Sequence, residues 1–184
     1  MARANTKNRL LEAAEAIVRE QGARHLTLDA VAERCNLSKG GVLYHFPTKV
    51  ALLQGMLDAY LEGESETFAR LTGEAPDETT ALELEIQTAF ANSVDNTHVS
   101  RALIAAVAEN PELTSSVQEF LDGKWREAVG KARDRNLAAV LLYSAMGVYL
   151  QEVLHCHSPD LLTGDDMPEL SDIRELMLHL AAQC

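Results

Sequence analysis

The fold is decided by residues 27–49, Thr27-Leu-Asp-Ala-Val-Ala-Glu-Arg-Cys-Asn-Leu-Ser-Lys-Gly-Gly-Val-Leu-Tyr-His-Phe-Pro-Thr-Lys49. The stretch contains two short helical segments, 28–35 and 39–46, joined by a tight link. Thr27 and Ser38 each stand where a helix begins, and their hydroxyl oxygens can accept bonds from the free amides of the first turn. Asn36 in the link tolerates the left-handed conformation that such a turn often needs. This pattern predicts a helix-turn-helix, a motif whose second helix enters the major groove of DNA.

This stretch and its flanks closely resemble the TetR (tetracycline repressor) family of bacterial regulators. The resemblance covers roughly residues 8–55, and the Tyr-x-Phe-x-x-Lys core of the family stands here as Tyr44-His45-Phe46-Pro47-Thr48-Lys49. It also rests on Leu26-Thr27-Leu28, on Val31-Ala32 and on the opening Ser38-Lys39-Gly40-Gly41. The resemblance implies an all-α fold of about nine helices. A helix-turn-helix DNA-binding domain over residues 1–47 would be followed by a helical ligand-binding and dimerisation domain over residues 48–184.

The family pattern also implies which residues meet double-stranded operator DNA. Thr27 and Lys49 begin helices whose free amides suit a phosphate, and Lys39 can reach a guanine edge or a phosphate. Gly40 and Gly41 have no side chain that could read a base, so specificity rests partly on DNA shape. Phe46 is expected in the core. The predicted DNA contacts are Thr27, Ser38, Lys39, Gly40, Gly41, Tyr44, His45 and Lys49.

Apolar periodicity and helix breakers predict the remaining elements. Pro76 marks a loop between the long fourth helix and the fifth. Asn110-Pro111 predicts an N-cap and the first position of the seventh helix. The nine expected helices span residues 7–21, 28–35, 39–46, 49–71, 79–94, 98–109, 111–133, 136–155 and 168–182.

The segment 137–150 is apolar around almost its whole circumference. Such a helix must be covered on all sides, and a partner subunit could cover the face that its own fold leaves bare. The resemblance implies that the last two helices form a four-helix interface in a homodimer, which would place two recognition helices on a palindrome. A buried central helix of a monomer is the alternative. The predicted interface residues are Leu137, Leu141, Val148, Ile173, Leu176, Met177 and Leu180.

Family members hold a small-molecule effector among helices 4 to 8, and its binding would pull helix 4 and change the spacing of the two recognition helices. Aromatic and flexible side chains could line such an apolar pocket, although each of them could equally belong to the core. The predicted pocket residues are Phe90, Phe120, Trp125, Tyr143, Met146 and Tyr149. A repressor or activator without any ligand is the alternative regulatory mode.

The 184-residue chain carries a net charge of −12, which on its own argues against binding to nucleic acid. The charge is uneven, however. Residues 1–50 contain eight basic and five acidic side chains, a net +3, so residues 51–184 carry −15. A local basic surface is enough to meet phosphates, so this asymmetry is compatible with DNA binding.

Other classes of protein are disfavoured. Three widely spaced cysteines predict no disulfide framework, and the absence of a signal peptide or a long apolar run predicts a cytoplasmic protein without a membrane anchor. His155-Cys156-His157 lacks the spacing of a metal site, so we expect no metal and no cofactor. An enzyme with dispersed catalytic residues is the competing class, but no nucleophile-elbow, P-loop, dinucleotide-binding or zinc-protease motif occurs.

Overall fold

The computed structural model describes residues 2–77, 79–91, 97–154 and 170–184 and is all-helical over these ranges. It contains nine α-helices there, as the sequence predicts. They are α1 (Ala2–Gln21), α2 (Leu28–Arg34), α3 (Lys39–His45), α4 (Lys49–Glu74), α5 (Ala81–Ala91), α6 (Thr97–Glu109), α7 (Thr114–Lys124), α8 (Arg135–Leu154) and α9 (Leu170–Ala181). Among the described residues, no helix is both long enough and apolar enough to cross a bilayer.

Contacts divide the chain into two units, and α4 contributes to both. The first unit comprises Met1–Glu62 and Asp95–Val117, and the second comprises Gly63–Val94 and Gln118–Cys184. The first unit thus contains more than the three helices of the predicted DNA-binding domain, because the start of α4 and the distant α6 pack with them. A functional boundary after residue 47 stays a prediction.

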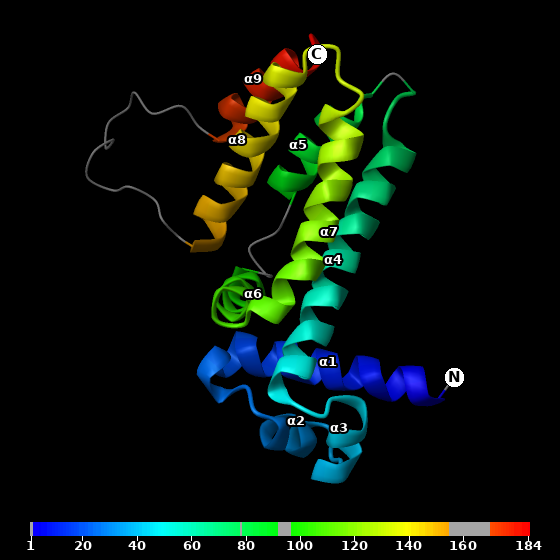
Figure 1. Ribbon diagram of the computed structural model, residues 1–184, viewed down its shortest axis with the longest axis vertical. Coiled ribbons are helices and arrows are strands. Elements are labelled where there is room, and N and C mark those ends of the chain that lie inside the picture. Colours follow the sequence, from blue (N-terminus) through cyan, green and yellow to red (C-terminus); the bar gives the residue numbers. More distant parts are fainter. Residues whose placement is uncertain (1, 78, 92–96, 155–169) are drawn as a thin grey trace, which may run out of the picture. The chain divides into compact units, whose positions relative to one another are not determined.

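In the first unit, α1 packs against α2 and α6, and α3 packs against α2 (Figure 1). The apolar side of α1 packs against α2, the start of α4 and α6, and its end is set by Gly22, which has a φ of 90°. Only glycine adopts this conformation without strain, and it is a common way to end a helix. The short 3₁₀ turn Ala23–His25 then leads into the helix-turn-helix. The buried core includes Leu10, Ala14, Ile17, Val18, Leu26, Val31, Val42, Phe46, Leu52, Met56 and Leu103.

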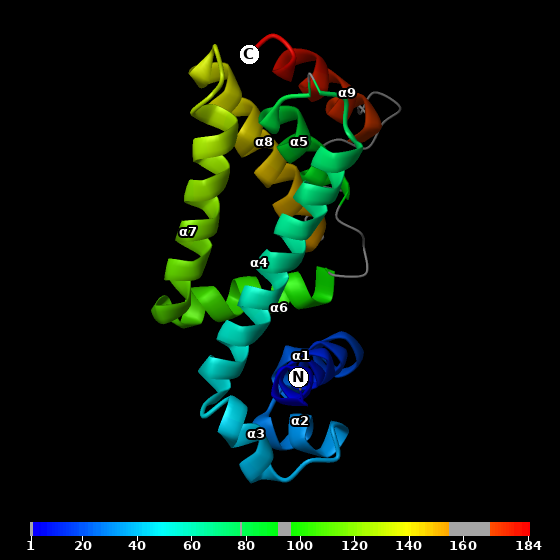
Figure 2. The same ribbon diagram turned by 90° about the vertical axis from the view of Figure 1, so that its right-hand side faces the viewer.

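In the second unit, α5 lies against α8, and the two helices run close together in both views (Figures 1 and 2). α9 packs against both of them. The buried core is formed by Leu82, Ile86, Ala128, Ala138, Leu141, Leu142, Ala145, Met177 and Ala181.

The predicted seventh helix, 111–133, is wrong in two places. It begins with a 3₁₀ turn, Pro111–Leu113, and it ends with a π-helical turn, Trp125–Val129, in which the Gly130 amide donates to the Trp125 carbonyl at 3.1 Å. A Cβ on Gly130 would collide with the Arg126 carbonyl. This wide turn depends on a single glycine and a local backbone geometry, so hydrophobic periodicity could not predict it.

Gly55 allows α4 to pack closely against Phe46 and against Leu11 of α1. A Cβ at this position would lie 2.7 Å from the Phe46 ring and 3.2 Å from Leu11. Gly55→Ala is therefore expected to lower the free energy of unfolding by about 1–3 kcal/mol, even though alanine is the better helix former. Thermal and urea unfolding followed by circular dichroism measure the change.

Gly63 in the same helix is the matched control, because nothing lies within 4 Å of the place where its Cβ would stand. Gly63→Ala should raise the free energy of unfolding by about 0.5–1 kcal/mol through helix propensity alone. Equal effects of the two substitutions would contradict the close packing of Phe46 on Gly55.

Candidate nucleic-acid interface

The helix-turn-helix is formed by α2 and α3, and both helices have the N-caps that the sequence predicts. The Thr27 hydroxyl accepts a bond from the Ala30 amide at 3.0 Å, and the Ser38 hydroxyl accepts one from the Gly41 amide at 3.2 Å. These bonds satisfy amides that would otherwise lack a partner at the helix ends. The side chains predicted to meet DNA therefore also define where the two short helices begin.

The link between the helices turns at Asn36, whose φ of 53° is left-handed, as predicted. The Asn36 amide donates to the Glu33 carbonyl at 3.0 Å, and the Leu37 amide donates to the Ala32 carbonyl at 2.9 Å. Both bonds use carbonyls at the end of α2 that have no partner within the helix. The turn therefore sets the direction in which α3 leaves α2.

Two apolar residues of this segment, Val42 in α3 and Phe46 just after it, are buried in the core of the first unit. The remaining positions of α3 face solvent. The Tyr44 side chain is 64% exposed, and its ring meets the half-buried His45 edge to face, with 5.1 Å between centroids. Leu43, next to Tyr44, is also exposed and is not among the predicted DNA contacts. An exposed apolar side chain on such a helix can contact a thymine methyl group.

Lys39 is not free at the start of α3. Its ammonium forms an ion pair with Asp29 of α2 at 3.0 Å, and both side chains are well exposed. Exposed pairs of this kind contribute about 0.2–1 kcal/mol, so a phosphate can compete for the lysine. This partner is not evident from the sequence, because the two residues are ten positions apart and meet only through the turn.

Lys49 begins α4 immediately after the cap Thr48, whose hydroxyl accepts a bond from the Ala51 amide at 3.0 Å. The Lys49 side chain is exposed, and within the described residues its ammonium forms no ion pair. A free cation next to the amides of a helix start is well suited to bind a phosphate oxygen.

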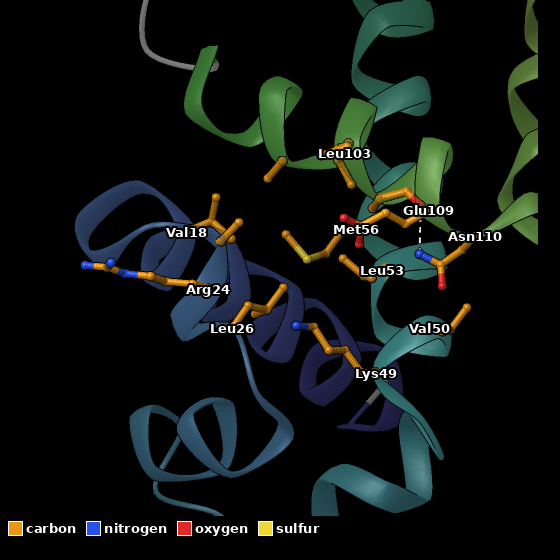
Figure 3. Close-up of a pocket in the computed structure, with 14 residues that line it drawn as sticks. Val18, Arg24, Leu26, Lys49, Val50, Leu53, Met56, Leu103, Glu109 and Asn110 are labelled. Carbon is orange, nitrogen blue, oxygen red and sulfur yellow. Dashed lines mark hydrogen bonds between the residues drawn. The ribbon is translucent and has the colours of Figure 1, made fainter.

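A cleft of about 390 Å³ lies beside Lys49 within the first unit. Figure 3 shows Lys49 at one edge of this cleft and Glu109 and Asn110 at another. The Asn110 side-chain amide donates to the Ala106 carbonyl of α6 at 2.7 Å. Most of the lining is apolar, with Val18, Leu26, Val50, Leu53, Met56 and Leu103 contributing.

The structure places most of the predicted effector-pocket residues against the core of the second unit or at a cleft. Phe90, Trp125 and Met146 pack against the core of the second unit, and Trp125 also meets Tyr143 with 4.7 Å between ring centroids. Phe120 lines a separate cleft that α4, α5 and α7 share. The role of all six residues in ligand binding, Tyr149 included, stays a prediction.

The predicted dimer-interface residues divide between core and surface. Leu141 and Met177 are buried in the second unit, Leu137, Ile173 and Leu180 pack against the same core, and Val148 is half-buried. Leu176, in contrast, is 58% exposed. Because α8 is apolar on all sides, its sequence does not tell which face turns inward. The buried residues among those predicted pack within this chain. The apolar side chains that α8 leaves exposed are not among the predicted ones; they are Val140, Tyr143, Leu150 and Leu154.

The candidate metal residues 155–157 lie outside the described residues. Within the described part of the chain, no group of three or more His, Cys, Asp or Glu side chains could hold a metal ion. Cys35 is buried, and burial raises the pKa of its thiol.

Two family models match the chain, and together they cover most of it. One describes bacterial regulatory proteins of the TetR family and matches residues 10–56. The other describes the C-terminal domain of tetracycline-repressor-like proteins and matches residues 81–170. No curated protein sequence matches the chain.

Solved structures share the fold at low sequence identity. A TetR transcription regulator from Haloarcula marismortui is 18% identical with a TM-score of 0.70, and the match covers 98% of each chain. The multidrug binding protein EbrR in complex with imidazole is 20% identical with a TM-score of 0.69, over 95% of this chain and 93% of that one. A TetR-family member from Streptomyces coelicolor A3 is 22% identical with a TM-score of 0.67, over 95% and 96%.

The helix-turn-helix geometry, the two family models and the shared all-helical fold agree with one another. The chain belongs to the TetR family of DNA-binding transcriptional regulators.

Proposed function

We propose that this protein is a homodimeric repressor that binds a palindromic operator through α3 and is released from it by a small molecule. The observation that carries the proposal is the exposed surface of α3 and the start of α4. There, Tyr44 and Lys49 are exposed on a motif with capped helices, and Lys49 forms no ion pair within the described residues. Both groups are suited to phosphate contacts, which position the protein and supply most of its affinity for DNA.

In this proposal, the other predicted contacts have complementary roles. The Lys39 ammonium exchanges its ion pair with Asp29 for a contact with a phosphate or a guanine edge. Thr27, Ser38 and His45 bind the sugar-phosphate backbone of the DNA. Gly40 and Gly41 allow close approach. Among the described residues outside their own helix backbone, a Cβ on Gly40 would meet the Ser38 hydroxyl at 3.9 Å, and one on Gly41 would meet that hydroxyl at 3.6 Å and Leu37 at 3.8 Å.

The surface of α8 supports the homodimer. Its exposed apolar residues Val140, Tyr143, Leu150 and Leu154 follow one another at helical spacing, with the exposed Gly147 between them. The opposite face of the helix is buried through Ala138, Leu141, Leu142 and Ala145. An exposed stripe at alternating spacings of three and four residues is what a packed helix pair buries, and a glycine within it allows close approach. Leu176 of α9 adds a further exposed apolar side chain.

The small-molecule response is supported by the clefts of the second unit and by EbrR, which has been solved with imidazole and with ethidium. α4 begins with Lys49, and its later residues Glu64 and Phe68 line one of these clefts. A ligand that moves this helix would therefore act on an element that carries a DNA contact. A regulator without a ligand would bind the operator but show no release by any small molecule.

Fluorescence anisotropy with the protein's own upstream intergenic DNA tests the DNA contact across a salt series. Lys49→Ala should weaken binding and reduce the slope of log affinity against log salt by about 1, because one phosphate contact is lost. Lys131→Ala, which removes an exposed lysine from the second unit, should leave the slope unchanged. Equal slopes for the wild type and Lys49→Ala would remove Lys49 from the interface.

The ion pair at the start of α3 gives a second prediction. Asp29→Asn should raise the affinity for DNA several-fold, because it releases Lys39 and removes a negative charge from the DNA-facing surface. Asp122→Asn, an exposed site in α7, is the control of equal charge change. If both variants bind as the wild type does, Lys39 makes no contact with DNA.

Light scattering after size exclusion tests the homodimer. Val140→Glu places a charge on the exposed face of α8, where its side chain is 59% exposed, and it should convert a dimer into a monomer without unfolding the chain. Gln118→Glu adds the same charge on exposed α7 and should remain dimeric. A Val140→Glu variant that stays dimeric would place the interface elsewhere.

A further inference from the structure

A cleft of about 400 Å³ in the second unit joins three helices that are far apart in sequence. Glu64 and Phe68 come from α4, Glu85 comes from α5, and Phe120 and Lys124 come from α7. Its volume is within the range of small-molecule sites. It therefore brings carboxylates, aromatic rings and one ammonium group to a single place.

Glu85 is an unusual residue for this position, because its side chain is 6% exposed. It accepts a bond from the Lys124 ammonium, whose side chain is 16% exposed. Burial raises the pKa of Glu85, Lys124 lowers it, and the neighbouring Glu64 carboxylate raises it again. A buried ion pair is weak evidence for stability, since its desolvation cost is comparable with its attraction. The pair therefore calls for another explanation.

Lys124 shows what kind of group this place holds. Its ammonium binds Glu85 and also lies over the Phe120 ring, 4.9 Å from the centroid. A carboxylate together with an aromatic face is the combination that proteins use to bind organic cations. The lysine side chain thus occupies a cation site that the rest of the cleft forms.

The charge of the surroundings favours a second cation over an anion. Glu64 and Glu119 line the cleft with Glu85, and the fourth carboxylate, Glu127, pairs with Lys131 outside it. Against these, the lining contains Lys124 and the exposed Arg126. Even with Lys131 counted, the carboxylates exceed the basic groups by one, four against three.

We propose that this cleft binds an organic cation with an apolar body, and that its charge takes the place of the Lys124 ammonium between Glu85 and Phe120. The proposal rests on the proposed ligand response and names its chemical class. Lys124 has a flexible stem and a partly exposed side chain, so its ammonium can move into water. Replacing one cation with another leaves the buried Glu85 carboxylate neutralised, while the Phe68 and Phe120 rings contact the apolar body.

Three probes of similar shape test the charge preference: benzyltrimethylammonium, phenylmethanesulfonamide and phenylmethanesulfonate, which are cationic, neutral and anionic. Isothermal titration of the full chain without DNA should show that the cation binds at least about tenfold more tightly than the anion, with the neutral probe between them. A cation that binds no more tightly than the anion would overturn the proposal.

Substitutions separate a ligand site from a merely structural ion pair. Lys124→Met keeps the length of the stem but removes the internal competitor, so it should tighten binding of the cation at least several-fold. Glu85→Gln and Phe120→Leu should each weaken it, Glu85→Gln by at least about tenfold. Arg70→Gln changes the net charge as Lys124→Met does, at an exposed ion pair with Glu74, and should leave the affinity unchanged.

A structural pair predicts the opposite for Lys124→Met, namely a less stable chain with no gain in cation binding, and this result would refute the site. Circular dichroism and the melting temperature establish that each variant is folded. Anisotropy with operator DNA is measured on the same samples. Selective DNA binding without cation binding would overturn this inference alone, whereas loss of selective DNA binding would overturn the proposed function whatever the cation does.

Discussion

The contact of Phe46 with Gly55 is the constraint on which the DNA-binding half of this protein depends. α3 has only seven residues and could not persist alone, because a single short helix does not repay the cost of its nucleation. It is held at one end by the Ser38 cap and at the other by Phe46, whose ring lies where any side chain on residue 55 would stand. A buried side chain therefore sets the position of the exposed ones that we propose to contact DNA.

The basic side chains near the proposed DNA-facing surface differ in whether a carboxylate pairs with them. Arg34 of α2 forms a two-bond pair with Glu20 of α1, which directs this cation back to the protein. Lys39 is held loosely by an exposed carboxylate, and Lys49 has no counterion within the described residues. These three basic side chains thus differ in how strongly a carboxylate of the same chain pairs with them. This gradation matters more than the net −12 of the chain, because phosphates respond to local cations.

The second unit contains both a strongly apolar helix, α8, and a buried ion pair. α8 buries one face among α5 and α9, and its opposite face keeps large apolar side chains exposed. Between α5 and α7, by contrast, Glu85 and Lys124 neutralise each other away from water. Exposed apolar surface and buried charge are both unfavourable in an isolated chain, so each is more readily explained by binding than by folding.

Local sequence was enough to predict the class of fold, the helix-turn-helix and its caps. The hydroxyl side chains of Thr27 and Ser38 and the left-handed Asn36 all act within a few residues of themselves. Tertiary structure alone decided which face of α8 is buried, that Asp29 pairs with Lys39, and that Glu85 meets Lys124 and Phe120 in one cleft. The physical reason is the distance along the chain over which each interaction acts. Capping and backbone preference involve neighbouring residues and can be predicted from a sequence, whereas burial and charge pairing depend on which distant residues the packing brings together.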